Sequence, residues 1–128
     1  MKLLLDTHIF IWWADHPEKL SHDALSALEN EANELLLSVA SVWEMQIKIQ
    51  LGKLTLSLPL TELLETQRET NDLTVSPVEL KHVLALDALP FHHKDPFDRL
   101  LIAQCIEENL TLVSGDAQLS AYPVKLLR

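Results

Sequence analysis

Short apolar runs alternate with amphipathic stretches along the whole chain, and this alternation predicts its secondary structure. In the first run, Leu3, Leu4 and Leu5 are consecutive rather than alternating with polar residues. Such runs are typical of strands that are covered on both faces, as in parallel sheets. The predicted strands are Lys2–Asp6, Leu35–Ala40, Leu73–Ser76 and Leu110–Val113, followed by an edge strand at Val124–Leu127.

Helical spacing of apolar residues, with capping residues at the ends, predicts a helix in most of the intervals. The predicted helices are Thr7–Ala14, Asp23–Ala32 after the N-cap Ser21, one that opens at Ser41 and ends at Gly52, Thr61–Glu69, Val78–Leu86, and one from Asp95-Pro96 to Glu108. In the fifth, we expect Leu80, Val83 and Leu84 to face inward. Strands that alternate with helices predict a single α/β domain over residues 1–128, with a central parallel sheet of four to five strands flanked by helices.

Composition limits the size, the cellular location and the binding mode that can be expected of this domain. A length of 128 residues with 48% hydrophobic content fits one domain with a real core. No apolar run approaches the roughly 20 residues that span a bilayer, and no signal peptide is recognisable, so we expect a cytoplasmic protein. The single cysteine, Cys105, lies in an apolar helical stretch and is expected in the core. A formal net charge of -9 argues against binding nucleic acid through a broad basic face.

Four acidic residues fall at what should be one edge of the sheet. Asp6 ends the first strand, and Asp116 follows the fourth. Glu44 is the fourth residue of Ser41-Val42-Trp43-Glu44 and Asp98 the fourth of Asp95-Pro96-Phe97-Asp98, so each is expected in the first turn of a helix. The carboxyl ends of parallel strands meet at the edge where α/β proteins collect their sites. We therefore predict a cluster of these four carboxylates.

Capping offers an alternative explanation for two of these acids. Ser-x-x-Glu and Asp-x-x-Asp are capping patterns, which would account for Glu44 and Asp98 without any chemistry. Four carboxylates at one edge, however, repel each other unless a cation lies among them. Oxygen ligands suit Mg²⁺ or Mn²⁺, whereas no Cys/His pair has the spacing of a zinc site.

The motifs, taken together, resemble a known family. They are Leu3-Leu4-Leu5-Asp6-Thr7-His8, Ser41-Val42-Trp43-Glu44, His93-Lys94-Asp95-Pro96-Phe97-Asp98-Arg99 with the apolar run up to Ala103, and Leu112-Val113-Ser114-Gly115-Asp116. In this order and at these spacings they resemble the PIN-domain family, in particular the VapC-type toxins of prokaryotic toxin–antitoxin pairs. The resemblance covers essentially the whole chain and implies a metal-dependent ribonuclease with a central parallel sheet.

Carried over by position, the resemblance gives each acid a role. It implies that Asp6, Glu44 and Asp98 are the three central acids, and that Asp116 is a fourth, more variable one. One or two divalent ions would bind the scissile phosphate, acidify a water molecule and stabilise the leaving oxygen. Many relatives have Thr-x-Asp where this chain has Ser114-Gly115-Asp116, which leaves the role of the Ser114 hydroxyl open.

Several neighbours of the acids are candidates for binding the substrate. Ser114 belongs to this group, and Thr7 either holds a water of the metal or caps the helix that follows it. His93, Lys94 and Arg99 are candidate phosphate contacts, and Arg99 is equally a candidate ion-pair partner for one of the acids. Adjacent side chains point apart, so His92 and His93 are not expected to share a metal ion. Asp95, which precedes Pro96, is expected to be an N-cap.

The remaining aromatic residues suggest contacts with a partner. Trp12, Trp13 and Trp43 are expected in the core or in an interface, although each could also stack on bases of single-stranded RNA. Two adjacent tryptophans are not expected to face the same interior, so at least one of them is a candidate for a partner surface. His8 is expected to pack at a helix start rather than to contact substrate.

The favoured function is that of a Mg²⁺- or Mn²⁺-dependent endoribonuclease toxin that forms a homodimer and is restrained by a cognate antitoxin. The net charge of -9 favours a basic partner. An aspartate-based phosphatase or phosphotransferase is a weaker alternative because the Asp-x-Asp start of such enzymes is absent at Asp6. A phosphoacceptor signalling domain lacks its expected paired acids. A catalytically silent PIN-like protein-binding domain stays open until activity is assayed.

Overall fold

A five-stranded sheet forms the centre of the molecule in the computed structural model, which describes residues 1–128. All neighbouring strands are parallel, in the order β3-β2-β1-β4-β5. The strands are β1 Lys2–Leu5, β2 Glu34–Ser38, β3 Thr74–Ser76, β4 Thr111–Val113 and β5 Lys125–Leu127. The predicted parallel α/β domain is therefore confirmed, with five strands and β5 at an edge.

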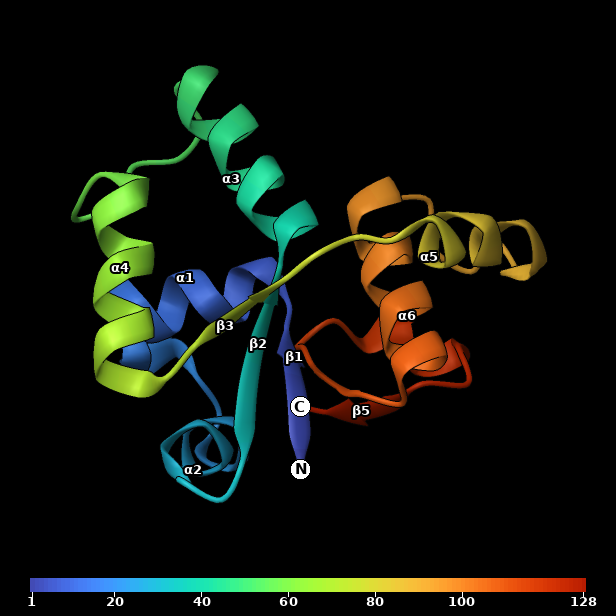
Figure 1. Cartoon of the computed structure of the whole chain (residues 1–128), viewed down its shortest axis with the longest axis horizontal. Helices are drawn as coiled ribbons and strands as arrows, with labels where there is room; N and C mark the ends of the chain where they lie inside the picture. The colour runs from blue at the N-terminus through green and yellow to red at the C-terminus, as the bar shows by residue number, and fades with distance from the viewer.

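Helices cover both faces of this sheet (Figure 1). The α-helices are α1 Thr7–Asp15, α2 His22–Glu29, α3 Val39–Gln50, α4 Leu60–Asn71, α5 Leu80–Ala85 and α6 Pro96–Glu108. Three short 3₁₀ segments, η1 Pro17–Lys19, η2 Leu86–Ala88 and η3 Ala117–Ala121, complete the chain. None of these helices has both the length and the apolar character needed to cross a bilayer.

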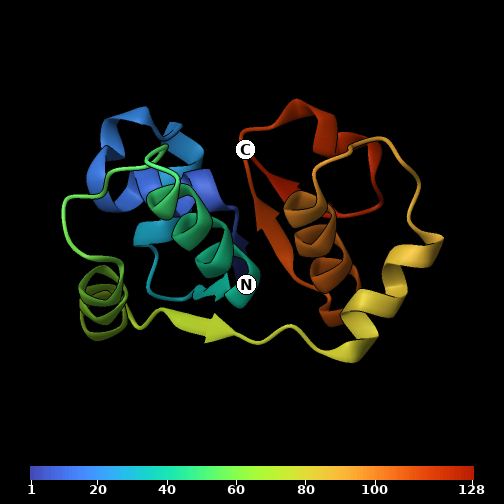
Figure 2. The same cartoon turned by 90° about the horizontal axis from the view of Figure 1, so that it is seen from above.

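The strands carry apolar side chains on both faces and so create two cores. Leu3 and Leu5 of β1 pack with residues of α1, α2, α3 and α4, whereas Leu4 packs with residues of α6 and η3. Figure 2 shows these two halves on either side of the central strands. Cys105 of α6 lies in the second core, where burial raises the pKa of its thiol to about 12, as expected for an inert core cysteine.

Three helix ends agree with the capping signals in the sequence. Ser21 caps α2 by accepting a hydrogen bond from the Ala24 amide at 3.0 Å. Gly52, at a φ of +71°, has the left-handed conformation expected after a helix. Asn109, at a φ of 56°, ends α6 in the same region of φ.

The orientation predicted for the fifth helix is wrong. Leu80, Val83 and Leu84 of α5 are 73%, 47% and 63% exposed, and the buried residue is His82. Two polar contacts of the His82 ring explain this orientation. Its Nδ1 accepts a hydrogen bond from the Glu79 amide at 2.9 Å, and its Nε2 lies 2.9 Å from Glu108 Oε1 on α6. These two contacts turn the apolar side of α5 toward solvent.

Two expectations for the aromatic residues also fail. Trp12 and Trp13 are both partly buried and pack against the same core, the one that contains Leu3 and Leu5. His8 is exposed, with its ring centroid 5.9 Å from that of Trp12. The exposed tryptophan is Trp43, on α3.

Candidate active site

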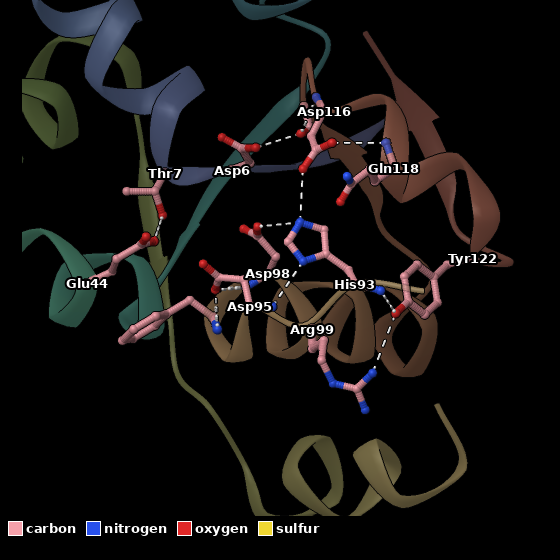
Figure 3. A network of polar contacts seen from close by, with 12 residues as sticks. Asp6, Thr7, Glu44, His93, Asp95, Asp98, Arg99, Asp116, Gln118 and Tyr122 are labelled. Carbon is pink, nitrogen blue, oxygen red and sulfur yellow. Dashed lines mark hydrogen bonds and ion pairs between the residues drawn. The ribbon is translucent and has the colours of Figure 1, made fainter. Parts of the chain in front are cut away.

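The four predicted acids gather where the strand order reverses. The chain runs from β1 outward through β2 and β3, and then returns to β4 on the other side of β1. Asp6 follows β1 at this junction, and its amide donates a hydrogen bond to the Val113 carbonyl of β4 at 3.0 Å. Sites in open parallel sheets lie outside the carboxyl ends of the strands at such a switch point. Figure 3 shows the side chains of Asp6, Glu44, Asp98 and Asp116 around one space at this edge.

Asp6 is held by hydrogen bonds to both of its carboxylate oxygens. It caps α1 by accepting a hydrogen bond from the Ile9 amide at 3.1 Å, and its Oδ2 accepts one from Ser114 Oγ at 2.6 Å. Ser114 is fully buried, and its Oγ also accepts a hydrogen bond from the Asp116 amide at 3.2 Å. The Ser114 hydroxyl, whose role was open, therefore connects two of the acids and is not exposed to a substrate.

Glu44 occupies a different place in its helix from the one predicted. α3 begins at Val39, because Ser38 caps it by accepting a hydrogen bond from the Ala40 amide at 3.0 Å. Glu44 therefore lies in the second turn, and the prediction that Ser41 opens the helix is wrong. The capping explanation for Glu44 fails with it. The helix dipole, which acts within the first turn, does little to keep Glu44 ionised.

Side chains, rather than a helix end, position the Glu44 carboxylate. Thr7 Oγ1 donates a hydrogen bond to Glu44 Oε1 at 2.6 Å, and Lys48 Nζ lies 3.0 Å from Oε2. Thr7 is 2% exposed, and its hydroxyl also lies 3.0 Å from Ser41 Oγ. The structure contradicts the predicted capping role of Thr7, since Asp6 is the cap of α1. The Thr7 hydroxyl is directed at Glu44, and its predicted role toward a water of the metal stays a prediction.

Asp98 lies in the first turn of α6, as predicted, and carries the most perturbed carboxylate of the site. Asp95 caps this helix by accepting hydrogen bonds from the Phe97 and Asp98 amides at 2.8 and 3.1 Å, which confirms its predicted role. Burial, then the negative charges of Asp95, Asp6 and Glu44, raise the pKa of Asp98 from 3.8 to about 7, against the opposing effect of His93. Burial and the neighbouring negative charges thus both disfavour the ionised form of Asp98.

His93 contacts two of the acids from the loop before α6. Its Nδ1 accepts a hydrogen bond from the Asp95 amide at 3.0 Å, so this nitrogen carries no proton. The ring proton is then on Nε2, which lies 3.0 Å from Asp116 Oδ2 and 3.3 Å from Asp98 Oδ2. His93 thus acts as a hydrogen-bond donor between two carboxylates, a role that the sequence prediction of a phosphate contact missed.

Asp116 is the most solvent-accessible of the four acids. Its side chain is 36% exposed, compared with 22% for Asp98 and 8% for Glu44. It caps η3 by accepting a hydrogen bond from the Gln118 amide at 2.9 Å through Oδ1, which leaves Oδ2 directed at His93. The carboxylate group therefore has one oxygen fixed by the backbone and one on the site side.

Arg99 does not reach the acids, contrary to both of its predicted roles. Its guanidinium is buried, donates hydrogen bonds to the carbonyls of Pro90 at 2.8 Å and Leu89 at 3.2 Å, and lies 4.0 Å from the centroid of the Phe91 ring. Figure 3 shows it pointing away from the four carboxylates. Lys94, in contrast, is exposed and makes no ion pair, so it stays a candidate phosphate contact.

Two supporting residues were missed at the sequence level. Lys48 follows Glu44 by four residues, and this i,i+4 spacing is a recognisable signal for an ion pair on a helix. Tyr122 carries no such signal: its hydroxyl accepts a hydrogen bond from the His93 amide at 2.9 Å and donates one to the Pro90 carbonyl at 2.7 Å. It holds the loop from which His93 reaches the site.

The sequence and the fold of this chain are matched by known proteins. The family model of the PIN domain matches residues 3–125. The chain belongs to the PIN-domain family. Ribonuclease VapC22 of Mycobacterium tuberculosis is 30% identical to this PIN domain over 122 residues, which cover 94% of the chain and 91% of that relative. The resemblance inferred from the four motifs is thereby confirmed.

Solved structures show the same fold at lower sequence identity. VapBC2 from Rickettsia felis bound to a DNA fragment from its promoter contains a chain with a TM-score of 0.76 and 19% identity, and the match covers 99% of this PIN domain and 98% of that chain. DNA-bound VapBC from Salmonella typhimurium gives a TM-score of 0.66 at 15% identity, with 99% and 97% covered. FitAcB from Neisseria gonorrhoeae gives 0.65 at 14% identity, with 98% and 96% covered.

Proposed function

We propose that this PIN domain is a metal-dependent endoribonuclease, which hydrolyses RNA phosphodiester bonds as the toxin of a type II toxin–antitoxin pair in the cytoplasm. The observation that carries the proposal is the convergence of Asp6, Glu44, Asp98 and Asp116 from four different parts of the chain. Its relative from Mycobacterium tuberculosis is named a ribonuclease, and the solved neighbours include VapBC assemblies. We extend both the ribonuclease activity and the pairing of toxin with antitoxin to this chain.

The donor set fits a divalent cation. All four acids offer carboxylate oxygens, which suit Mg²⁺ or Mn²⁺. Lys48 is the only lysine or arginine in an ion pair with any of the four, and it pairs with Glu44 alone. Burial, and then the negative charges of the neighbouring acids, raise the pKa of Asp98, and a bound cation would oppose both effects. Asp6, Glu44, Asp98 and Asp116 would hold the ion, which when bound supplies charge neutralisation at the phosphate and acidifies a water molecule.

The surrounding residues of the chain hold the acids in place for this chemistry. Ser114 fixes Asp6, and Thr7 with Lys48 fixes Glu44, so neither carboxylate has to reorganise when substrate arrives. We assign the orientation of the attacking water to Asp116, because it is the most exposed acid. Exposed Lys94 is the remaining candidate for a phosphate contact.

Two protein partners belong to this proposal. The first is an antitoxin that places a basic side chain among the carboxylates, where positive charge is lacking and where a net charge of -9 favours a basic partner. The second is another copy of the chain, since Leu80 and Leu84 of α5 with Phe91 leave large apolar side chains 73%, 63% and 79% exposed. Sedimentation compares the mass of wild type in solution with that of Leu84→Glu. Equal masses for the two proteins would contradict a dimer formed through α5.

Cleavage of defined RNAs tests the enzymatic proposal. We expect wild type to cut single-stranded RNA with Mn²⁺ or Mg²⁺, to lose activity in EDTA, and to leave a phosphomonoester such as p-nitrophenyl phosphate intact. Asp6→Asn should abolish cleavage while its circular dichroism stays that of wild type. Full activity in Asp6→Asn or in EDTA would overturn the proposal, and hydrolysis of the monoester alone would favour a phosphatase. Co-expression with the product of the neighbouring reading frame, expected to be a small DNA-binding protein, tests the antitoxin.

A further inference from the structure

Two aromatic side chains lie directly beside two of the acids. Trp43 precedes Glu44 on α3, and Phe97 precedes Asp98 on α6. Their ring centroids are 5.3 Å apart at an interplanar angle of 71°, an edge-to-face pair that joins the two helices. The same helical segments that carry the two carboxylates therefore also carry an aromatic pair.

Most of the Trp43 indole is left open to solvent. It is 62% exposed, whereas Trp12 and Trp13 are partly buried against the core. The contact with Phe97 orients the ring without covering it. Buried indoles usually serve packing, so an oriented and exposed indole beside catalytic carboxylates is a feature that folding alone does not require.

The cations near the site supply little attraction for a polyanion. Arg99 is buried and its donors are used on main-chain carbonyls, and Lys48 is paired with Glu44 at 3.0 Å. Lys94 is exposed and unpaired, on a chain whose net charge is -9. Proteins that bind nucleic acid through phosphate contacts use many cations, so the lysine and arginine side chains near this site contribute little affinity of that kind.

We propose that Trp43, oriented by Phe97, is a stacking platform for an unpaired nucleobase next to the scissile phosphate. This inference rests on the proposed ribonuclease function and assigns to one residue the binding of a base beside the cleaved bond. Every base has a π-face, and stacking on an aromatic side chain gives affinity that does not depend on charge. Bases inside an A-form duplex are stacked on each other and cannot reach such a platform.

Steady-state cleavage of an unstructured oligoribonucleotide tests the platform through KM. We expect Trp43→Ala to raise KM about tenfold at nearly unchanged kcat, and Trp43→Phe to restore most of the affinity. Leu51→Ala is the matched control, because Leu51 lies just after the same helix and is 63% exposed. The same sequence in a duplex should be a poor substrate for wild type. An unchanged KM in Trp43→Ala overturns the inference.

A binding measurement separates this inference from the function on which it rests. In Asp6→Asn protein, a single-stranded oligoribonucleotide should quench tryptophan fluorescence, and the added Trp43→Phe exchange should remove the quench although Trp12 and Trp13 remain. If wild type shows no cleavage, the proposed function fails, and a quench that requires Trp43 still supports the platform. A quench that persists without Trp43 overturns the platform. So does a change in oligomeric mass in Trp43→Ala with KM unaltered, which would assign the indole to a protein interface.

Discussion

Replacing Asp98 by asparagine should stabilise the metal-free protein while destroying its activity. The Asp98 side chain is only 22% exposed and lies among Asp95, Asp6 and Glu44, so its ionised form is unfavourable in the folded state. Asparagine has nearly the same shape and carries no charge. Function and stability are therefore opposed at this position, as is common for residues of active sites.

The magnitude follows from the shift of the Asp98 pKa from 3.8 to about 7. A difference of ~3 pH units at 1.36 kcal/mol each gives ~4 kcal/mol as the upper value. The sign is set by proton binding: between the two pKa values the folded state holds a proton that the unfolded state has lost. Stability of the metal-free wild type therefore falls as pH rises from about 4 to about 7, and the cost is fully present above that window.

Urea unfolding in EDTA measures this effect. At about pH 8 we expect Asp98→Asn to exceed wild type in free energy of unfolding by ~2–4 kcal/mol, and at about pH 4 to equal it. Asp72→Asn, which removes an exposed aspartate at the end of α4, is the control and should show no such window. Added Mg²⁺ should stabilise wild type and not Asp98→Asn. If the difference in free energy of unfolding between wild type and Asp98→Asn does not vary with pH, the cost assigned to ionised Asp98 is refuted.

Three further predictions concern residues that support the site. Thr7→Val, which removes the hydrogen bond to Glu44 Oε1, should lower the free energy of unfolding by ~2 kcal/mol and weaken Mn²⁺ binding by calorimetry, whereas Thr55→Val on the exposed surface should do neither. Arg99→Lys should lower the free energy of unfolding in urea by ~2–3 kcal/mol and leave the KM for RNA unchanged. A higher KM without loss of stability would instead show that Arg99 binds the substrate. Nitrogen NMR of the metal-free protein at about pH 8 should show His93 protonated on Nε2 alone, and a proton on Nδ1 would contradict the contact with the Asp95 amide.

The placement of the acids was predictable because it depends on topology more than on side-chain detail. Once short apolar runs are assigned to parallel strands, the residues after them must meet at one edge, and Asp6 and Asp116 follow from that rule alone. The position of Asp98 could be predicted equally well, because Asp95-Pro96 marks a helix start with little ambiguity. The structure confirms the placement of these residues; their chemistry stays a proposal.

The details that failed depend on competition between local signals. Ser38 and Ser41 are both good N-caps, and only the tertiary structure shows that Ser38 starts α3 while Ser41 faces Thr7. The positive charge of Arg99 predicts attraction to acids or phosphate, but not that backbone carbonyls one loop away will bind it first. His82 reverses α5 through contacts with Glu79 and Glu108, a polar effect that apolar periodicity does not report.

The hydrogen bond between Ser114 and Asp6 joins residues 108 positions apart, and this separation bears on when the acidic cluster forms. Ser114 is itself held by its amide, which donates to the Leu127 carbonyl of β5 at 3.0 Å. A nascent chain on the ribosome therefore contains Asp6 early, but completes its carboxylate cluster only after residue 127 has been made and β4 has inserted beside β1. Pairing between segments so distant in the sequence is slow, so the assembly of this carboxylate cluster is a late step of folding.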